Sequence, residues 1–388
     1  MSVTTTVKQS IPIARPYVGQ EEEEAVLQSL RSGWLSQGPR VAEFEKKFAE
    51  YVGAKHAIAV SSCTTALHLA FIGANLGPGD EVLCPSLSFI ATANSVRYVG
   101  AIPIFVDIDP STYNIDPDRV LEAITPRTRA ILVIHQMGMP CDLPTFSEIA
   151  NRHGIALVED AACATGSEIL IHGRWEPIGR PRGQIACFSF HPRKVITTGD
   201  GGMLTTSNPK FDAKFKLLRQ HGMSVPDAVR HESPQVIFEN YLVAGYNYRM
   251  TDIQAAIGLK QLERLPQIIA RRRFLADRYA ELLGNIEELR LPVEPEWARS
   301  NWQSYCVRLS ERVDQKAVMQ GLLDNGIATR RGIMCSHREP CYSDQKLRHD
   351  LRQSELAQDH SILLPIYAQM TEDDQLRVVD ALVRELRR

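Results

Sequence analysis

One lysine stands in the segment FSFHPRKVITTGDGG, which runs from Phe188 to Gly202. Lys194 follows an apolar, strand-like run and precedes a glycine-rich stretch in which the backbone can turn sharply. Lysines usually lie in solvent, but a lysine held beside a central strand can lose its proton more easily and form a Schiff base. Ser189, five residues earlier, adds a hydroxyl group near the same strand end. The segment makes Lys194 a candidate nucleophile.

A candidate anion site comes earlier, in SSCTTALHLA (61–70), where small hydroxyl residues follow a strand and begin a helix. Backbone N–H groups and the positive end of the helix dipole could together hold one anionic group there. A plain helix cap is the commoner use of such residues. Neither GxGxxG nor GxxxxGKS occurs, so the sequence indicates neither a dinucleotide nor a nucleoside triphosphate. A single phosphate stays open as the ligand.

A carboxylate lies between these two signals, because Asp160 ends the apolar run ALVED. At the end of a buried strand, a carboxylate costs free energy unless donors or a cation meet it. Capping the next helix is the more common role of such an aspartate. Beside a pyridine ring, it would keep the ring nitrogen protonated, as pyridoxal phosphate chemistry requires. An anion site, a carboxylate and a Schiff-base lysine, in this order, predict that chemistry.

The elements that must position these residues alternate between short apolar runs and helical periods. Strands are predicted at 56–62, 81–86, 102–109, 129–135, 156–161, 185–190 and 202–207. This alternation is typical of an α/β fold with a mainly parallel sheet flanked by helices, in which ligands bind at the carboxyl ends of the strands. The last two strands follow one another without a helix, which predicts one antiparallel member.

After about residue 260 the pattern changes to long charged helices, a single strand at 305–310 and a C-terminal helix at 372–386. We therefore predict a large domain over residues 12–262 and a smaller C-terminal α+β domain over residues 263–388. The four glutamates at 21–24 predict the acidic first turn of a helix.

Composition narrows the classes of partner. The 388 residues are 44% hydrophobic and 23% charged, with a formal net charge of −2 and no dense run of Lys and Arg. This charge distribution argues against a nucleic acid partner. The N-terminal sequence lacks the features of a secretory signal, and no apolar run is long enough to span a bilayer. We expect a soluble, cytoplasmic protein without a membrane partner.

Eight cysteines are scattered along the chain without a CxxC pair. Cys335 and Cys341 flank His337, but a single histidine at this irregular spacing makes a poor zinc site. We expect buried, reduced thiols and no bound metal.

Longer motifs extend over nearly the whole chain. They are SGWLSQGPRVAEFEKKFAEYVGAKHAIAVSSCTTALHLA, PSLSFIATAN, VEDAACATG, FSFHPRKVITTGDGG, GYNYRMTDIQAAIG and LLPIYAQMT. With these motifs the chain resembles the fold-type I pyridoxal phosphate enzymes, and specifically the DegT/DnrJ/StrS family of sugar aminotransferases. The resemblance implies pyridoxal 5′-phosphate as the cofactor, pyridoxamine 5′-phosphate as its form between half-reactions, and a homodimer with shared active sites.

The resemblance also implies a role for each motif residue. Lys194 would form the Schiff base (the internal aldimine) and later move the proton, and Asp160 would pair with the pyridinium nitrogen. Phe89 would stack on the cofactor ring, which suits a flat π-system. The cofactor phosphate would be held by backbone groups of Cys63 and Thr64, by the Ser189 hydroxyl and, from a second subunit, by Asn247.

One position departs from the commonest pattern of the family. Where many relatives have Gln or His to hydrogen-bond the cofactor's 3-hydroxyl, this chain has Cys163 in EDAACATG. A thiol is a weak donor. Cys163 either fills this role weakly or packs as a small buried residue.

Two segments are candidates for binding the substrate. Gly33 and Trp34 either line the substrate entrance or only pack the N-terminal loop. A second, basic group lies in RRGIMCSHREPCY and consists of Arg330, Arg331, His337 and Arg338. These side chains could bind the diphosphate of a sugar nucleotide through bidentate guanidinium bonds, or they could form a solvated charged loop.

The predicted reaction is a transamination in two halves with a ping-pong mechanism. The amino group would come from a donor that the resemblance suggests is L-glutamate. It would be transferred to a keto sugar, either a nucleotide-linked 4-keto-6-deoxy sugar or a 3-keto sugar. A keto-cyclitol or another small ketone is an alternative acceptor. A pyridoxamine-dependent sugar dehydratase would have histidine in place of Lys194. A cofactor-binding regulator without turnover would need a DNA-reading domain or a damaged site, and the sequence shows neither.

Overall fold

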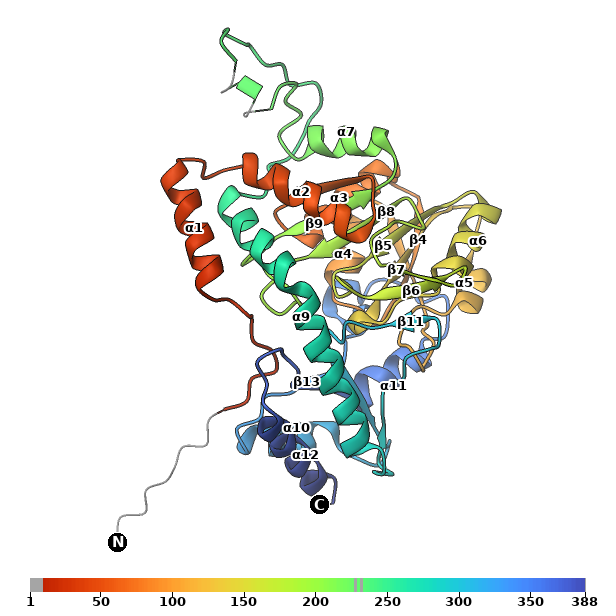
Figure 1. Ribbon diagram of the computed structural model, residues 1–388. Coiled ribbons are helices and arrows are strands. Elements are labelled where there is room, and N and C mark those ends of the chain that lie inside the picture. The colour runs from red at the N-terminus through yellow and green to blue at the C-terminus, as the bar shows by residue number, and fades with distance from the viewer. Residues whose placement is uncertain (1–9, 227–228, 231–232, 388) are drawn as a thin grey trace.

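A computed structural model describes residues 10–226, 229–230 and 233–387. Its largest sheet contains seven strands, namely β1 (His56–Val60), β2 (Glu81–Pro85), β3 (Ile102–Val106), β4 (Thr128–Ile134), β5 (Ala156–Asp160), β8 (Ile185–Ser189) and β9 (Gly202–Thr206). They follow the order β1-β9-β8-β5-β4-β2-β3. Figure 1 labels β9, β8, β5 and β4 of this sheet. Only β9 runs antiparallel to its neighbours, β1 and β8. The α/β fold with one antiparallel strand is therefore confirmed, and each predicted strand ends within three residues of the observed one.

Helices cover both faces of this sheet, so the central strands are buried on both sides. One face packs against α2 (Pro39–Val52), α5 (Pro117–Ala123), α6 (Leu143–His153) and the start of α9 (Asp252–Leu283). The other face packs against α3 (Cys63–Gly73), α4 (Ala91–Tyr98) and α7 (Pro209–Leu218). The outer helix α1 (Gln20–Ser32) lies beside α9 and begins with the predicted acidic turn (Figure 1).

Aromatic packing fixes the strand that leads to the predicted lysine. Phe48 of α2 meets Phe188 of β8 with ring centroids 5.0 Å apart, and it meets Phe190 just beyond the strand at 5.5 Å. Both phenylalanines of the β8 segment are fully buried. This packing holds the end of β8 against α2, on the face of the sheet opposite the one that α3 covers.

A second hydrophobic core surrounds the C-terminal half of α9. It contains a four-stranded sheet of order β10-β12-β14-β13 together with α10 (Gln315–Asp324) and α12 (Glu372–Leu386). The strands are β10 (Leu289–Arg290), β12 (Tyr305–Leu309), β13 (Arg330–Arg331) and β14 (Ser361–Leu364). The strand predicted alone at 305–310 therefore has partners. Those partners have only two to four residues, which is too short for a periodic pattern.

The long helix α9 joins the two cores, since it runs without a break from Asp252 to Leu283. The boundary predicted at residues 262 and 263 lies inside this helix, and the division into two domains stays a proposal. A third, small sheet was not predicted. It consists of β6 (Glu168–Ile171), β7 (Arg174–Pro177) and β11 (Ala298–Arg299).

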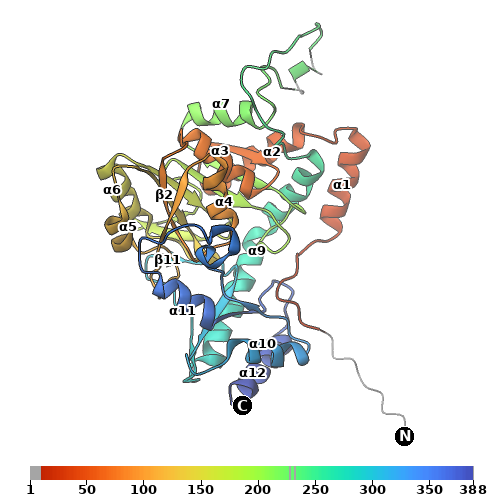
Figure 2. The ribbon, with the colours of Figure 1, turned by 180° about the vertical axis from the view of Figure 1, so that it is seen from behind.

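Two helices whose N-cap residues, Gly38 and Leu351, provide no side-chain cap are capped by carboxylates from distant parts of the chain. Asp252 accepts hydrogen bonds from the backbone N–H groups of Gly38 and Val41 at 2.8 and 3.0 Å, at the start of α2. Asp107, just after β3, accepts bonds from Gln353 and Ser354 at 2.8 and 2.7 Å. These two residues lie in the first turn of α11 (Arg352–His360), which lies between the large sheet and helices α10 and α12 (Figures 1 and 2).

The cysteines are all free of disulfide bonds. Six are buried, whereas Cys163 is half-buried and Cys341 is exposed, so the expectation of buried thiols fails at these two positions. Among the helices in the described part of the chain, none combines the length and the hydrophobicity that crossing a lipid bilayer requires.

Candidate active site

The carboxyl ends of β2, β4, β5 and β8 lie at one edge of the large sheet, and a cavity of about 370 Å³ lies there. Seven of the eight predicted cofactor residues line this cavity. They are Cys63, Thr64, Phe89, Asp160, Cys163, Ser189 and Lys194. They come from four separate segments of the sequence, which the parallel sheet brings together.

Lys194 lies in the loop between β8 and β9, and this loop is closed at its base. The Phe190 N–H donates to the Gly201 carbonyl at 2.9 Å, and the Thr198 N–H donates to the Phe190 carbonyl at 3.0 Å. Lys194 is half-buried. Its Nζ lies 3.0 Å from the Cys163 sulfur, which fixes the direction of the side chain into the cavity.

The surroundings of Lys194 favour its charged form. Burial lowers the pKa of Lys194, but the Cys163 sulfur and the Asp160 carboxylate outweigh burial and leave the pKa above its ordinary value. The expectation of an easily deprotonated lysine is thus wrong for these surroundings. Cys163 lies 31 residues earlier in the chain, so the sequence pattern around the lysine does not show the contact.

Asp160 ends β5 and is only 6% exposed. Its carboxylate accepts hydrogen bonds from the Ala162 N–H at 3.0 Å and from the Thr92 hydroxyl at 3.3 Å. Burial nevertheless raises the pKa of Asp160, because these donors and the charge of Lys194 compensate only in part. A carboxylate in this state gains free energy from one more cationic N–H partner in the cavity. Thr92 was missed, although it belongs to the motif PSLSFIATAN.

The start of α3 forms the predicted anion cradle. Ser62 caps the helix by accepting a hydrogen bond from the Thr65 N–H at 3.2 Å, and the Thr65 hydroxyl accepts one from the Ser62 N–H at 3.1 Å. A helix start leaves its first N–H groups for an external acceptor, here those of Cys63 and Thr64. A Cβ atom at Gly202 would lie 2.4 Å from the Ser62 carbonyl carbon, so only glycine lets β9 pass this close.

Two further side chains complete this part of the cavity. Ser189, 7% exposed, ends β8, and its hydroxyl accepts a weak hydrogen bond from the His191 N–H at 3.4 Å. Phe89 precedes α4 and is 64% exposed, which is unusual for a phenylalanine in an ordered segment. An exposed aromatic ring at a cavity suits a flat π-system as its partner. The lysine, carboxylate, helix start, hydroxyl and ring together fit pyridoxal phosphate.

Six of the predicted site residues do not line the cavity, and the first three are Asn247, Gly33 and Trp34. Asn247, the eighth predicted cofactor residue, is exposed, and its side-chain oxygen accepts a hydrogen bond from Arg249 at 3.3 Å. Gly33 ends α1 with a φ of 77°, a conformation that favours glycine. Trp34 next to it is half-buried. None of the three lines the cavity.

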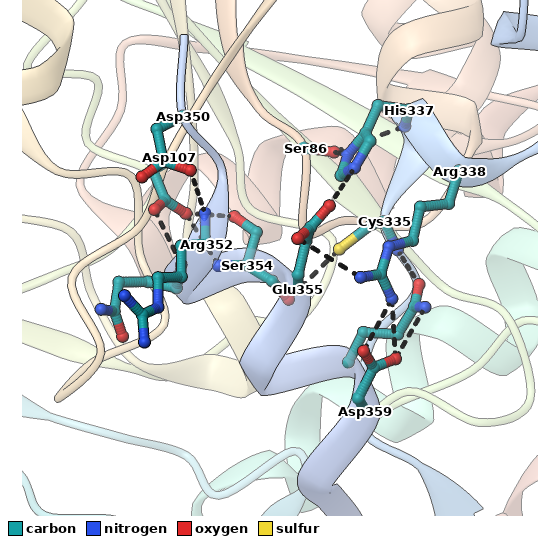
Figure 3. Close-up of polar contacts among 12 residues, drawn as sticks. Ser86, Asp107, Cys335, His337, Arg338, Asp350, Arg352, Ser354, Glu355 and Asp359 are labelled. Atoms are coloured by element: carbon teal, nitrogen blue, oxygen red, sulfur yellow. Dashed lines mark hydrogen bonds and ion pairs between the residues drawn. The ribbon is translucent and has the colours of Figure 1, made fainter.

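His337 and Arg338 form part of a polar network that joins α11 to the end of β2 (Figure 3). The His337 ring lies 2.6 Å from the Ser86 hydroxyl and 3.0 Å from the Glu355 carboxylate. Arg338 donates to the Asp359 carboxylate at 2.7 Å. The cavity lining includes neither residue, and their contact with a substrate stays a prediction.

The two arginines of β13, Arg330 and Arg331, lie in different environments. Arg331 lies 3.5 Å from the Glu339 carboxylate and does not line the cavity. Arg330 lines the cavity, together with His191 and Arg193 from the Lys194 loop. His191 and Arg193 were missed, although they stand in the same motif as the lysine.

Comparison with known proteins places this geometry in a family. The profile of the DegT/DnrJ/EryC1/StrS aminotransferase family matches residues 16–383. The chain is 40% identical to the GDP-perosamine synthase of Caulobacter vibrioides over 376 residues, which covers 96% of this chain and 97% of the relative.

Solved structures show the same fold. The aminotransferase TlmJ of Streptoalloteichus hindustanus is 33% identical and superposes with a TM-score of 0.89, covering 97% of this chain and 99% of that chain. The protein Spr1654 of Streptococcus pneumoniae, in its pyridoxamine phosphate form, is 25% identical with a TM-score of 0.91 and covers 97% and 99% of the two chains. The chain is a pyridoxal-phosphate-dependent sugar aminotransferase, and it belongs to the DegT/DnrJ/EryC1/StrS aminotransferase family.

Proposed function

We propose that the protein transfers an amino group from L-glutamate to a nucleotide-linked keto sugar, either a 4-keto-6-deoxy sugar or a 3-keto sugar. The observation that carries the proposal is that Lys194 and Asp160, from two separate strand ends, line one cavity with an anion cradle. The substrate class is supported by the relative that is named GDP-perosamine synthase. The same class is supported by the basic side chains of the cavity wall.

Each residue has a stated task in this proposal. Pyridoxal phosphate, when bound, supplies an electron sink for the carbon that loses a proton. Asp160 would hold a proton on the ring nitrogen, since burial raises the pKa of its carboxylate and a cationic N–H partner would offset that burial. Lys194 moves the proton at the reacting carbon, and Phe89 keeps water from one face of the site. The first N–H groups of α3 and the Ser189 hydroxyl bind the phosphate.

The proposal includes a homodimer in which Asn247 of one subunit completes the site of the other. Asn247 lies outside the cavity of its own chain, and its exposed side chain can reach a neighbour.

The first test compares the visible absorption of wild-type protein and the Lys194→Ala variant, each supplied with pyridoxal phosphate. We expect a yellow band only in the wild type, fixed to Lys194 by borohydride and bleached by L-glutamate. The bleached enzyme is then offered keto sugars linked to different nucleotides, and return of the band identifies the acceptor. The same band in the variant, or none in the wild type, contradicts the role of Lys194.

A further inference from the structure

One wall of the cavity is cationic. It consists of Arg193, which comes from the Lys194 loop, and of Arg330, which comes from β13 of the other sheet, and it lies beside His191 and Asp200 of the same loop. Both arginine side chains keep solvent exposure at this wall. The wall is separate in sequence from the start of α3, which is the cradle proposed for the cofactor phosphate.

In the part of the chain that the structure describes, no carboxylate pairs with either guanidinium group of this wall. Within residues 10–226, 229–230 and 233–387, neither Arg193 nor Arg330 makes a side-chain hydrogen bond or an ion pair. The nearby Arg331 and Arg338, in contrast, pair with Glu339 and Asp359. The wall therefore presents free donors, whereas the rest of the basic group is neutralised.

The charges of the wall also repel one another. Burial lowers the pKa of Arg193, and the positive charge of Arg330 lowers it further, whereas the Cys163 sulfur raises it. The pKa of His191 beside them is lowered first by burial and then by the charge of Arg193, which favours the neutral ring. Asp200 opposes this effect, and Lys194 and Arg330 add to it. Like charges held together favour an anion that would sit between them.

The backbone holds both arginines in place. The Gln303 side chain donates to the Arg193 carbonyl at 2.6 Å. Arg330 pairs with Leu363 in the β13–β14 ladder, and Leu363 lines the cavity as well. Because successive residues of a strand point to opposite faces, Arg331 is directed away from the cavity.

We propose that Arg193 and Arg330 form a subsite for an oxyanion of a substrate, bound by charge-assisted hydrogen bonds from both sheets. Two sources supply this chemistry, a carboxylate of the amino donor and the diphosphate of the acceptor. The inference rests on the proposed function, because the ligand is a substrate of that reaction.

The experiment uses the holoenzyme with Arg193→Gln and Arg330→Gln as the test variants. Arg119→Gln is the matched control, since Arg119 is exposed on α5, pairs with Glu122 and lies outside the cavity. One arm measures the L-glutamate concentration that half-bleaches the cofactor band, and the affinity for glutarate by calorimetry. The other arm measures calorimetric affinities for UDP and GDP. Melting temperature and bound cofactor show that each variant is folded.

We expect each test variant to weaken binding in one arm by about tenfold to a hundredfold, the range for lost charge-assisted bonds. Arg→Lys variants should lose less, because they keep the charge but not the bidentate geometry. Weaker glutamate and glutarate binding identifies a donor carboxylate, and weaker nucleotide binding identifies a diphosphate. If both folded Gln variants bind all ligands as the control does, the arginines are only solvated charges and the subsite is refuted.

Failure of the subsite and failure of the proposed function are distinguishable. If glutamate bleaches the cofactor band of the wild type, and the Gln variants bind every ligand as tightly as the wild type does, only the subsite is refuted. A wild type that never responds to an amino acid, but binds glutarate or nucleotides through both arginines, refutes only the proposed function.

Discussion

Lys194 lies between two groups that favour its protonated form, the Cys163 sulfur at 3.0 Å and the Asp160 carboxylate. Removing the sulfur leaves burial, which lowers the pKa of Lys194, with less opposition. In Cys163→Ala apoenzyme we expect the pH profile of Lys194 acylation to move to lower pH. Peptide mass spectrometry after timed labelling at each pH measures the extent of Lys194 acylation. Cys341→Ala, at an exposed cysteine, serves as the control and should leave the profile in place.

Asp160 makes a second prediction at this scale, about stability. Its pKa in the folded protein is raised, so ionisation costs folding free energy at every pH above the ordinary value of about 3.9. Apo Asp160→Asn should therefore melt at the same or a higher temperature than wild type at pH 7, and the difference should vanish as the pH falls towards 4. Turnover should fall by about tenfold to a hundredfold.

Two measurements check the Asp160 prediction. Calorimetric melting of the apoproteins over a pH series gives the melting temperatures. The rate at which glutamate bleaches the cofactor band gives the loss of catalytic rate. Asp373→Asn on the exposed part of α12 controls for loss of a surface charge. A variant that melts well below wild type at pH 7 would contradict the stability argument.

Single residues were predictable where one short motif contains both the element and the functional group. Asp160 stands at a strand end and Lys194 in the loop after one, both marked by the sequence, and the structure brings both to the cavity. Arg330 and Arg331 could not be separated, because only the pairing of a two-residue strand decides which one faces the cavity. The substrate roles of His337 and Arg338 stay predictions, since ion pairs from α11 engage both side chains.

At the scale of elements, strands of the large sheet were predictable because continuous burial selects apolar runs. The short strands β10 and β13 were not, since two residues contain no period. The carboxylate caps of α2 and α11 were also hidden. Asp252 and Asp107 lie more than 200 residues from the N–H groups that they bind, so no local rule for helix starts identifies them.

The cap on α11 gives a prediction for this element. Asp107→Ala leaves the N–H groups of Gln353 and Ser354 without their acceptor, and we expect the free energy of unfolding to fall by about 1–3 kcal/mol. Urea unfolding followed by fluorescence measures the change. Asp350→Ala is the matched control, because that exposed carboxylate accepts, among the described residues, a single hydrogen bond, from the Arg352 N–H at 3.2 Å (Figure 3). Equal losses in both variants would show that the long-range cap contributes nothing special.

At the scale of the whole molecule, the segment before Asn247 presents apolar side chains to solvent. The exposed fractions are 84% for Val236, 87% for Phe238, 64% for Tyr241 and 63% for Leu242. Exposed apolar surface of this kind marks a contact with another protein. We expect a second copy of the chain to cover it, as the proposed homodimer requires.

Subunit mixing tests the homodimer. Lys194→Ala should be inactive, and Asn247→Ala should lose cofactor affinity. If each site uses Lys194 from one subunit and Asn247 from the other, unfolding and refolding the two variants together restores activity in about a quarter of the sites. Light scattering gives the mass in parallel. A monomeric mass, or a mixture no more active than its parts, contradicts the shared site.

The remote caps of α2 and α11 also constrain the order in which the chain folds. Helix nucleation is costly, and the N–H groups that Asp252 and Asp107 bind receive these acceptors only after more than 200 intervening residues have been brought together. In α11, among the described residues, Asp350 supplies a local acceptor for the Arg352 N–H alone. The first turns of both helices should therefore form late, after the main folding barrier. Mutations at Asp107 and Asp252 are then expected to speed unfolding while leaving the refolding rate nearly unchanged.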